Sequence, residues 1–143
     1  MRGRIAIAGG VLLLAARIAA AAGLVVEGAW IRTPPPGATM LAGYARLRNA
    51  GAAPIVVTGA DGADFGSVSL HESISADGVE RMRPLTELTI APGATVLFAP
   101  GGRHFMLMRP TRALAAGDRA RIHISTSSGD GATADFVVAD APP

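Results

Sequence analysis

The stretch Arg103-His104-Phe105-Met106-Leu107-Met108-Arg109 alternates between two kinds of side chain. Successive side chains of a β-strand point to opposite faces, so His104, Met106 and Met108 share one face, and Phe105 and Leu107 share the other. The pair Phe105 and Leu107 suits a hydrophobic core. The stretch therefore predicts a strand whose second face directs an imidazole and one or two thioethers towards one point in space.

Outward from this stretch, the chain consists of short strand-like segments separated by Gly, Pro, Asn and Asp. Many short strands with turn residues between them are typical of an antiparallel sandwich or barrel. We therefore expect an all-β fold. The expected strands are residues 24–31, 42–48, 55–58, 68–74, 79–85, 88–90, 95–98, 104–108, 119–126 and 133–138.

Residues 1–22 have the pattern of a signal peptide, and residues 23–143 are expected to form one domain. Arg2 and Arg4 precede an apolar run over 5–16, and small residues over 19–22 offer a cleavage site. The run is shorter than the roughly 20 residues that span a membrane. A retained membrane anchor is the alternative. Because no cysteine is present for lipid attachment, we expect export with no stable anchor after cleavage.

Charge and composition exclude several classes of function. Three of the 13 basic residues lie in the expected signal peptide and all 11 acidic residues follow it, which leaves 10 basic and 11 acidic groups in the domain. No basic stripe remains for nucleic-acid binding. The sequence has no phosphate-binding glycine loop, no Gly-x-Ser-x-Gly elbow and no carboxylates paired for acid–base chemistry, so we do not expect an enzyme.

A second candidate segment is the hairpin around Asp77-Gly78, a strong two-residue turn signal. Counting from this turn pairs Ser73 with Met82 and places His71 opposite Pro84. His71 then lies on the same face as Met82, on the diagonal where long side chains meet. The same face of the first strand carries a series of serines, so His71 belongs to a polar face rather than to the core.

The sequence leaves open whether Met82 points to the core face or to the outer face of its strand. A methionine in a strand is usually core, and its neighbours Arg81 and Arg83 would then point outward. The pairing with His71 favours the opposite face. A position at the rim of the core would satisfy both patterns.

The shared chemistry of these side chains favours monovalent copper. Imidazole and thioether donors suit Cu(I), whereas harder metals prefer carboxylates and water. Thioethers do not form disulfides, so they remain usable ligands in an oxidising compartment. Methionine is not a usual zinc ligand, and a blue-copper centre needs a cysteine that this chain lacks. Met40 or Met108 could also cover such a metal, whereas His123 is expected to be solvated or structural.

The spacing of the candidate ligands resembles that of a known family. His71, ten residues, Met82, twenty-one residues and then His104-Phe105-Met106 match the pattern of the PCu(A)C family of periplasmic copper chaperones. Residues 101–108, the opening Ala29-Trp30-Ile31-Arg32 and the strand that ends in Arg48-Asn49 are also similar. The resemblance spans essentially the whole of residues 23–143.

This resemblance implies a cupredoxin-like antiparallel Greek-key β-sandwich that binds one Cu(I) ion. It implies His71, Met82, His104 and Met106 as the ligands, a periplasmic location, and delivery of copper to the CuA centre of cytochrome oxidase or to an assembly factor. Two alternatives remain. One is a periplasmic copper buffer with the same site, and the other is a β-sandwich that binds only protein partners.

Overall fold

A computed structural model describes residues 23–143, and the expected signal peptide lies outside the described residues. The described residues form strands joined by turns, with no helix of the length and apolarity that crossing a membrane would require. The expectation of an all-β fold is therefore confirmed. The strands are β1 (Leu24–Arg32), β2 (Met40–Asn49), β3 (Ile55–Asp61), β4 (Phe65–Ala76), β5 (Val79–Pro84), β6 (Leu88–Ile90), β7 (Thr95–Phe98), β8 (Arg103–Pro110), β9 (Arg119–Thr126) and β10 (Ala132–Ala139).

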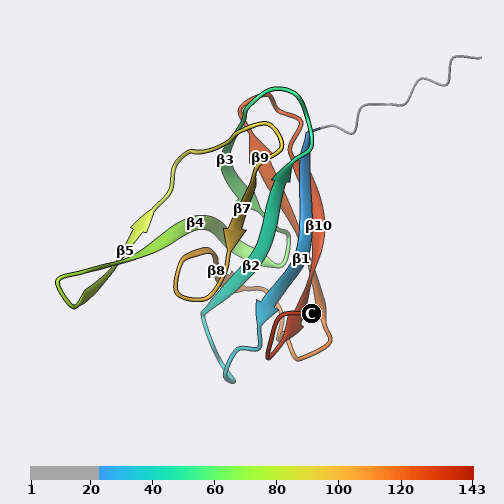
Figure 1. Cartoon of the computed structure of the whole chain (residues 1–143). Helices are drawn as coiled ribbons and strands as arrows, with labels where there is room; N and C mark the ends of the chain where they lie inside the picture. The colour runs from blue at the N-terminus through green and yellow to red at the C-terminus, as the bar shows by residue number, and fades with distance from the viewer. Residues whose placement is uncertain (1–22) are drawn as a thin grey trace, which may run out of the picture.

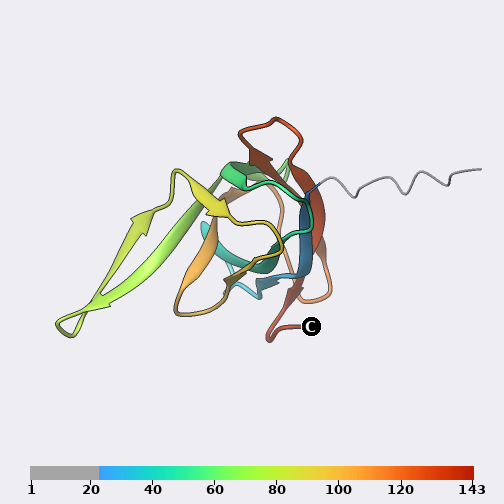
Figure 2. The same ribbon diagram turned by 45° about the horizontal axis from the view of Figure 1, so that its top comes forward.

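The strands form one hydrogen-bonded sheet that closes on itself. Its order is β5-β4-β8-β7-β2-β1-β10-β9-β3-β6, and additional pairings of β4 with β3 and of β8 with β2 complete a ring. Figure 1 and Figure 2 show the resulting barrel-like body. The pairings are antiparallel except for β1–β10 and β7–β8, which are parallel, so the expectation of a wholly antiparallel arrangement is corrected. The finer assignment, a cupredoxin-like Greek-key sandwich, stays a prediction.

The core lies inside this ring, and β8 contributes the face predicted from its alternation. Phe105 and Leu107 are fully buried. The ring of Phe105 stacks on Phe98 at 4.6 Å and meets Phe136 edge-on at 5.6 Å. Burial of these side chains places the alternate residues of β8 on the outer face of the barrel, where they can serve a function.

The β4–β5 hairpin extends beyond the barrel body, as the two views agree (Figures 1 and 2). Its turn residues Asp77 and Gly78 have φ values of 53° and 75°, as a two-residue type I′ turn requires. The register that follows pairs Ser73 with Met82 and His71 with Pro84, which confirms the register predicted from the sequence.

The packing of β8 leads to a stability prediction. Leu107→Ala should lower the free energy of unfolding by about 2–5 kcal/mol, because it removes buried methyl groups and leaves a cavity. The matched control is Leu97→Ala, since Leu97 is 55% exposed on β7 and its truncation should change stability by about 0.5 kcal/mol or less. Urea unfolding of both variants measures the difference. Equal destabilisation would contradict the assignment of the two faces.

Candidate metal centre

Strand pairing brings the two candidate histidines side by side. In the antiparallel β4–β8 ladder, His71 lies directly opposite His104, and Ser69 lies opposite Met106. Because alternate residues of a strand share a face, His71, His104 and Met106 all point to the same side of the sheet. Met82 joins this side through Ser73, its partner in the β4–β5 ladder. The structure thus brings the four predicted site residues onto one face.

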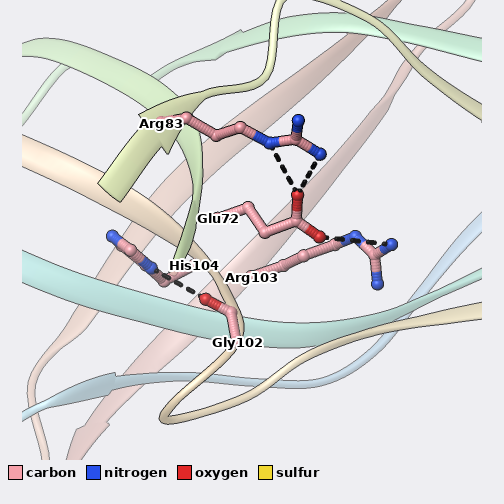
Figure 3. Close-up of polar contacts among 5 residues, drawn as sticks. All are labelled: Glu72, Arg83, Gly102, Arg103 and His104. Atoms are coloured by element: carbon pink, nitrogen blue, oxygen red, sulfur yellow. Dashed lines mark hydrogen bonds and ion pairs between the residues drawn. The ribbon is translucent and has the colours of Figure 1, made fainter. Parts of the chain in front are cut away.

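The two imidazole rings are close and nearly parallel, with centroids 5.8 Å apart and an interplanar angle of 23°. Nδ1 of His104 lies 3.3 Å from the carbonyl oxygen of Gly102, to which it can donate a hydrogen bond (Figure 3). That bond holds the proton on Nδ1 and leaves the Nε2 lone pair free for a metal. Nε2 of His71 lies 3.0 Å from Oγ of Ser69; in the tautomer that donates this bond, the Nδ1 lone pair is free.

Burial favours the neutral, metal-binding form of His71. His104 is only 9% exposed, and His71 is half-buried beside it. Desolvation lowers the pKa of His71 from its ordinary value of 6.5, and the neighbouring charge of His104 lowers it further. A metal binds the neutral imidazole, so these effects reduce the competition from protons at neutral pH.

Met82 lies on an exposed strand, which resolves the ambiguity in its sequence pattern. All six residues of β5 are exposed, and Met82 itself is 54% exposed. Strand β5 pairs only with β4 among the described residues, so neither of its faces contacts the core. Alternation of Met82 with Arg81 and Arg83 therefore carries no information about burial here. Met82 is an accessible thioether rather than core packing.

A hollow of about 330 Å³ adjoins the paired strands. Three of the four candidate ligands line it, namely Met82, His104 and Met106, and Met40 from the start of β2 lines it as well. His71 is not among its lining residues. The remaining lining residues come mainly from the proline-rich loop after β1 and from β2; they are Arg32, Thr33, Pro34, Pro35, Leu41, Ala42, Tyr44, Ser73 and Gly101.

Glu72 forms a charged bridge on the opposite face of β4. It lies between Arg83 of β5 and Arg103 of β8 in the ladder register. One carboxylate oxygen accepts hydrogen bonds from Nε and Nη2 of Arg83 at 3.0 and 2.7 Å, and the other lies 3.6 Å from Nη2 of Arg103 (Figure 3). The bridge thus connects the strand that carries Met82 to the strand that carries His104.

Other candidate residues have different surroundings. His123 lies on β9 with its Nδ1 2.9 Å from the hydroxyl of Thr133, which is consistent with the structural role expected for it. Met108 lies directly opposite Met40 in the β2–β8 ladder and does not line the hollow. Within residues 23–143, no three His, Cys, Asp or Glu side chains cluster in a way that could hold a metal. The two histidines and two methionines that share one face of the sheet are therefore the candidate metal ligands.

Sequence reasoning did not identify the supporting residues of the site. Ser69 and the carbonyl of Gly102 contact the imidazoles, and Glu72 connects the three strands. Ser69 is visible in retrospect because it shares the face and alternation of His71. The Gly102 contact has no side-chain signal, since any residue has a backbone carbonyl.

The Glu72 bridge gives a testable prediction. Glu72→Gln removes both charge pairs, so amide hydrogen exchange in β5 should become faster than in the parent protein, while β8 stays protected by the core. The loss in global stability should be about 1 kcal/mol or less, because the pairs are partly exposed. Asp135→Asn, which breaks an exposed pair with Arg121, is the matched control. Unchanged exchange in β5 would show that the bridge does not hold this strand.

Sequence comparison with known proteins finds a matching family and a related protein. The model of a family described as "Putative lipoprotein LpqE-like" matches residues 24–138, nearly the whole of the described chain. A protein of Leifsonia xyli subsp. xyli (strain CTCB07), named "Putative lipoprotein Lxx21020", is 33% identical over 117 residues. That match covers 81% of this chain and 68% of the relative.

Solved structures with the same fold include PCuAC domains. The solution structure of CuI-DR1885 from Deinococcus radiodurans matches with a TM-score of 0.66 and 29% identity, covering 88% of this chain and 86% of that one. The apo PCuAC domain of PmoF2 matches with a TM-score of 0.67 and 27% identity over 84% of this chain and 94% of its own. The copper-bound form of that domain matches with a TM-score of 0.69 at 24% identity, over 83% and 94%.

Proposed function

This chain belongs to the LpqE-like family and has the fold of PCuAC domains, and from this premise we propose that it is a carrier of one Cu(I) ion. The observation that supports the proposal best is the register of β4, β8 and β5. It gathers His71, His104, Met106 and Met82 on one face beside a hollow. Relatives with this fold have been solved with copper bound, among them CuI-DR1885.

The donor set suits the ion. Two neutral imidazoles and two neutral thioethers add no negative charge, so they favour the lower charge and soft character of Cu(I). The hydrogen bonds to Ser69 and Gly102 orient the rings, as partners of metal-binding histidines commonly do. In this proposal His71, Met82, His104 and Met106 are the ligands, and copper is cargo rather than a catalytic cofactor.

Exposure favours a carrier over a buffer. His104 is buried and His71 is half-buried, whereas the Met82 side chain is 54% exposed at the edge of the site. An acceptor protein can therefore approach the ion from the Met82 side and compete for it without disturbing the packing of the core. An acceptor with thiolate ligands, such as the CuA subunit of cytochrome oxidase or an assembly factor, would bind Cu(I) more strongly than imidazole and thioether do.

The proposed location is the periplasm, after removal of residues 1–22 as a signal peptide. The family and its Leifsonia relative are described as lipoproteins, which is consistent with export. The 143 residues contain no cysteine, so they include no thiol for lipid attachment. We propose that the domain acts without enzymatic chemistry, exchanging copper with its partners by ligand substitution.

Copper titration of variants tests the proposed site. Residues 23–143 should bind one equivalent of Cu(I) in competition with a Cu(I) chelator. Met106→Leu should weaken binding about tenfold or more through loss of a sulfur ligand, while the apo protein melts within a few degrees of the parent. Met108→Leu, on the same face of the same strand, is the control and should bind normally. Two equivalents of similar strength, preference for Zn(II), or full affinity in Met106→Leu would refute the assignment.

The affinity for Cu(I) should depend on pH. Because the pKa of His71 is lowered from 6.5, its imidazole stays neutral at pH 7 and gains a proton only below that value. Affinity should therefore be nearly constant above about pH 6.5 and should fall as the pH drops further, since protons then compete with the metal. Chelator competition between about pH 7.5 and 5 measures this. A site made of thioethers alone would give a flat profile.

A further inference from the structure

Met40 is a fifth soft donor beside the proposed site. It is the first residue of β2, and its side chain is 50% exposed. It lines the same hollow as Met82, His104 and Met106. Most large apolar side chains in this domain are buried, so a thioether left open at this position calls for an explanation.

The β2–β8 register shows that Met40 can reach the site. Met40 lies opposite Met108, and Ala42 lies opposite Met106, so Met40 and Met106 are diagonal neighbours on one face. Diagonal neighbours are about 7–8 Å apart, with their Cβ atoms somewhat closer, which is within reach of two long side chains. Between them Ala42 contributes only a methyl group. The path from Met106 to Met40 is therefore not filled by a large side chain of β2.

A hydrogen bond beside Met40 fixes the backbone at this position, whereas the side chain of Met40 is half exposed. The amide of Arg109 donates a hydrogen bond to the carbonyl of Thr39 at 2.8 Å, which extends the β2–β8 pairing past Met40. Methionine has three rotatable side-chain bonds and no branch, so its sulfur can sweep a large volume from a fixed backbone. A fixed backbone with an exposed, unbranched side chain suits a ligand that binds in one state of the site and releases in another.

We propose that Met40 is a transfer ligand, which replaces His71 on Cu(I) when the ion moves into the hollow. This inference rests on the proposed function. Of the four proposed ligands, His71 alone does not line the hollow, whereas Met40 does. An ion drawn from the strand face into the hollow thus keeps Met82, His104 and Met106 within reach, loses His71 and gains Met40.

The exchange needs no other reactant. A bond forms between copper and the sulfur of Met40, and the bond between copper and the imidazole nitrogen of His71 breaks. Copper remains Cu(I), no proton is transferred, and the coordination number is the same before and after. The product has three thioethers and one imidazole, and its new ligand, Met40, is 50% exposed, so an acceptor can approach the ion from that side.

The first experiment compares equilibrium binding with the rate of transfer. Met40→Leu keeps a similar apolar volume, so the apo fold and the Kd for Cu(I) should stay within about threefold of the parent. The rate at which Cu(I) passes to an excess of a dithiolate chelator should fall about tenfold. Met108→Leu, the cross-strand partner outside the hollow, is the control and should transfer at the parent rate. Parent-like transfer by Met40→Leu would overturn the proposal, as would loss of equilibrium binding, which would make Met40 a permanent ligand.

The second experiment removes the ligand that Met40 is proposed to replace. In His71→Ala, copper should move to the hollow, and X-ray absorption should show three sulfur neighbours in place of the two in the parent. Met40→Leu should then weaken Cu(I) binding at least about tenfold in the His71→Ala background, although it has little effect in the parent protein. Such a difference between backgrounds would show that positions 40 and 71 are coupled.

These outcomes separate the inference from the proposed function. Two sulfurs in His71→Ala, or no coupling between positions 40 and 71, would overturn the role of Met40 and leave the proposed site in place. If the parent protein itself bound no Cu(I), the proposed function would fail and the role of Met40 with it.

Discussion

The antiparallel pairing of β4 with β8 is the constraint on which the rest of the molecule depends. It sets His71 opposite His104 and Ser69 opposite Met106, and it also sets Leu70 opposite Phe105. A slip of one residue would turn each side chain of a strand to the other face. Leu70 and Phe105 are buried, so a slip would expose them and move the imidazoles into the core. Burial of core side chains on the inner face thus fixes the register of β4 and β8, and with it the positions of the candidate ligands on the outer face.

Burial decreases across the candidate site from β8 to β5. His104 is withdrawn from solvent and contacts a backbone carbonyl, whereas Met82 lies on a strand without core contacts and is connected through the Glu72 bridge. The proposed carrier role would use both kinds of ligand, because buried ligands hold an ion and accessible ones let an acceptor reach it. The hairpin carries Met82 outside the barrel body (Figures 1 and 2), since the only ladder of β5 among the described strands is with β4.

Local signals in the sequence are sufficient to predict the strands and the hairpin. Asp77-Gly78 determines the turn type, the turn determines the register, and alternation then assigns His71 to its face. The alternation of β8 likewise separates Phe105 and Leu107 from the residues of the outer face. Local patterns therefore group His71 with Met82 and His104 with Met106, and the family resemblance joins the two pairs and supplies their common role.

Features that depend on contacts between distant segments cannot be predicted from local sequence patterns. The closure of the sheet through β3 and β4 and the parallel pairing of β1 with β10 depend on contacts between distant segments, which short patterns do not encode. Asn49 is a further example. It is fully buried, and its amide group donates to the carbonyls of Ala53 and Ile90 and accepts from the amide of Gly51. In the sequence alone, an asparagine at a strand end looks like a turn residue, because its distant partner Ile90 leaves no local signal.

In the proposed site, the position of the hollow determines from which side an ion could be exchanged. The inner face of β4 and β8 is packed with core side chains, so the sheet blocks any approach to the proposed site from that side. The loop over Thr33–Pro35 forms one wall of the hollow, and Met40 and Met82 stand at exposed positions around it. The proposed exchange would therefore take place on the side of the hollow, where Met40 and Met82 are exposed. Thioethers carry no proton at any accessible pH, so in the proposed site the ability of Met40 and Met82 to bind copper would not depend on pH.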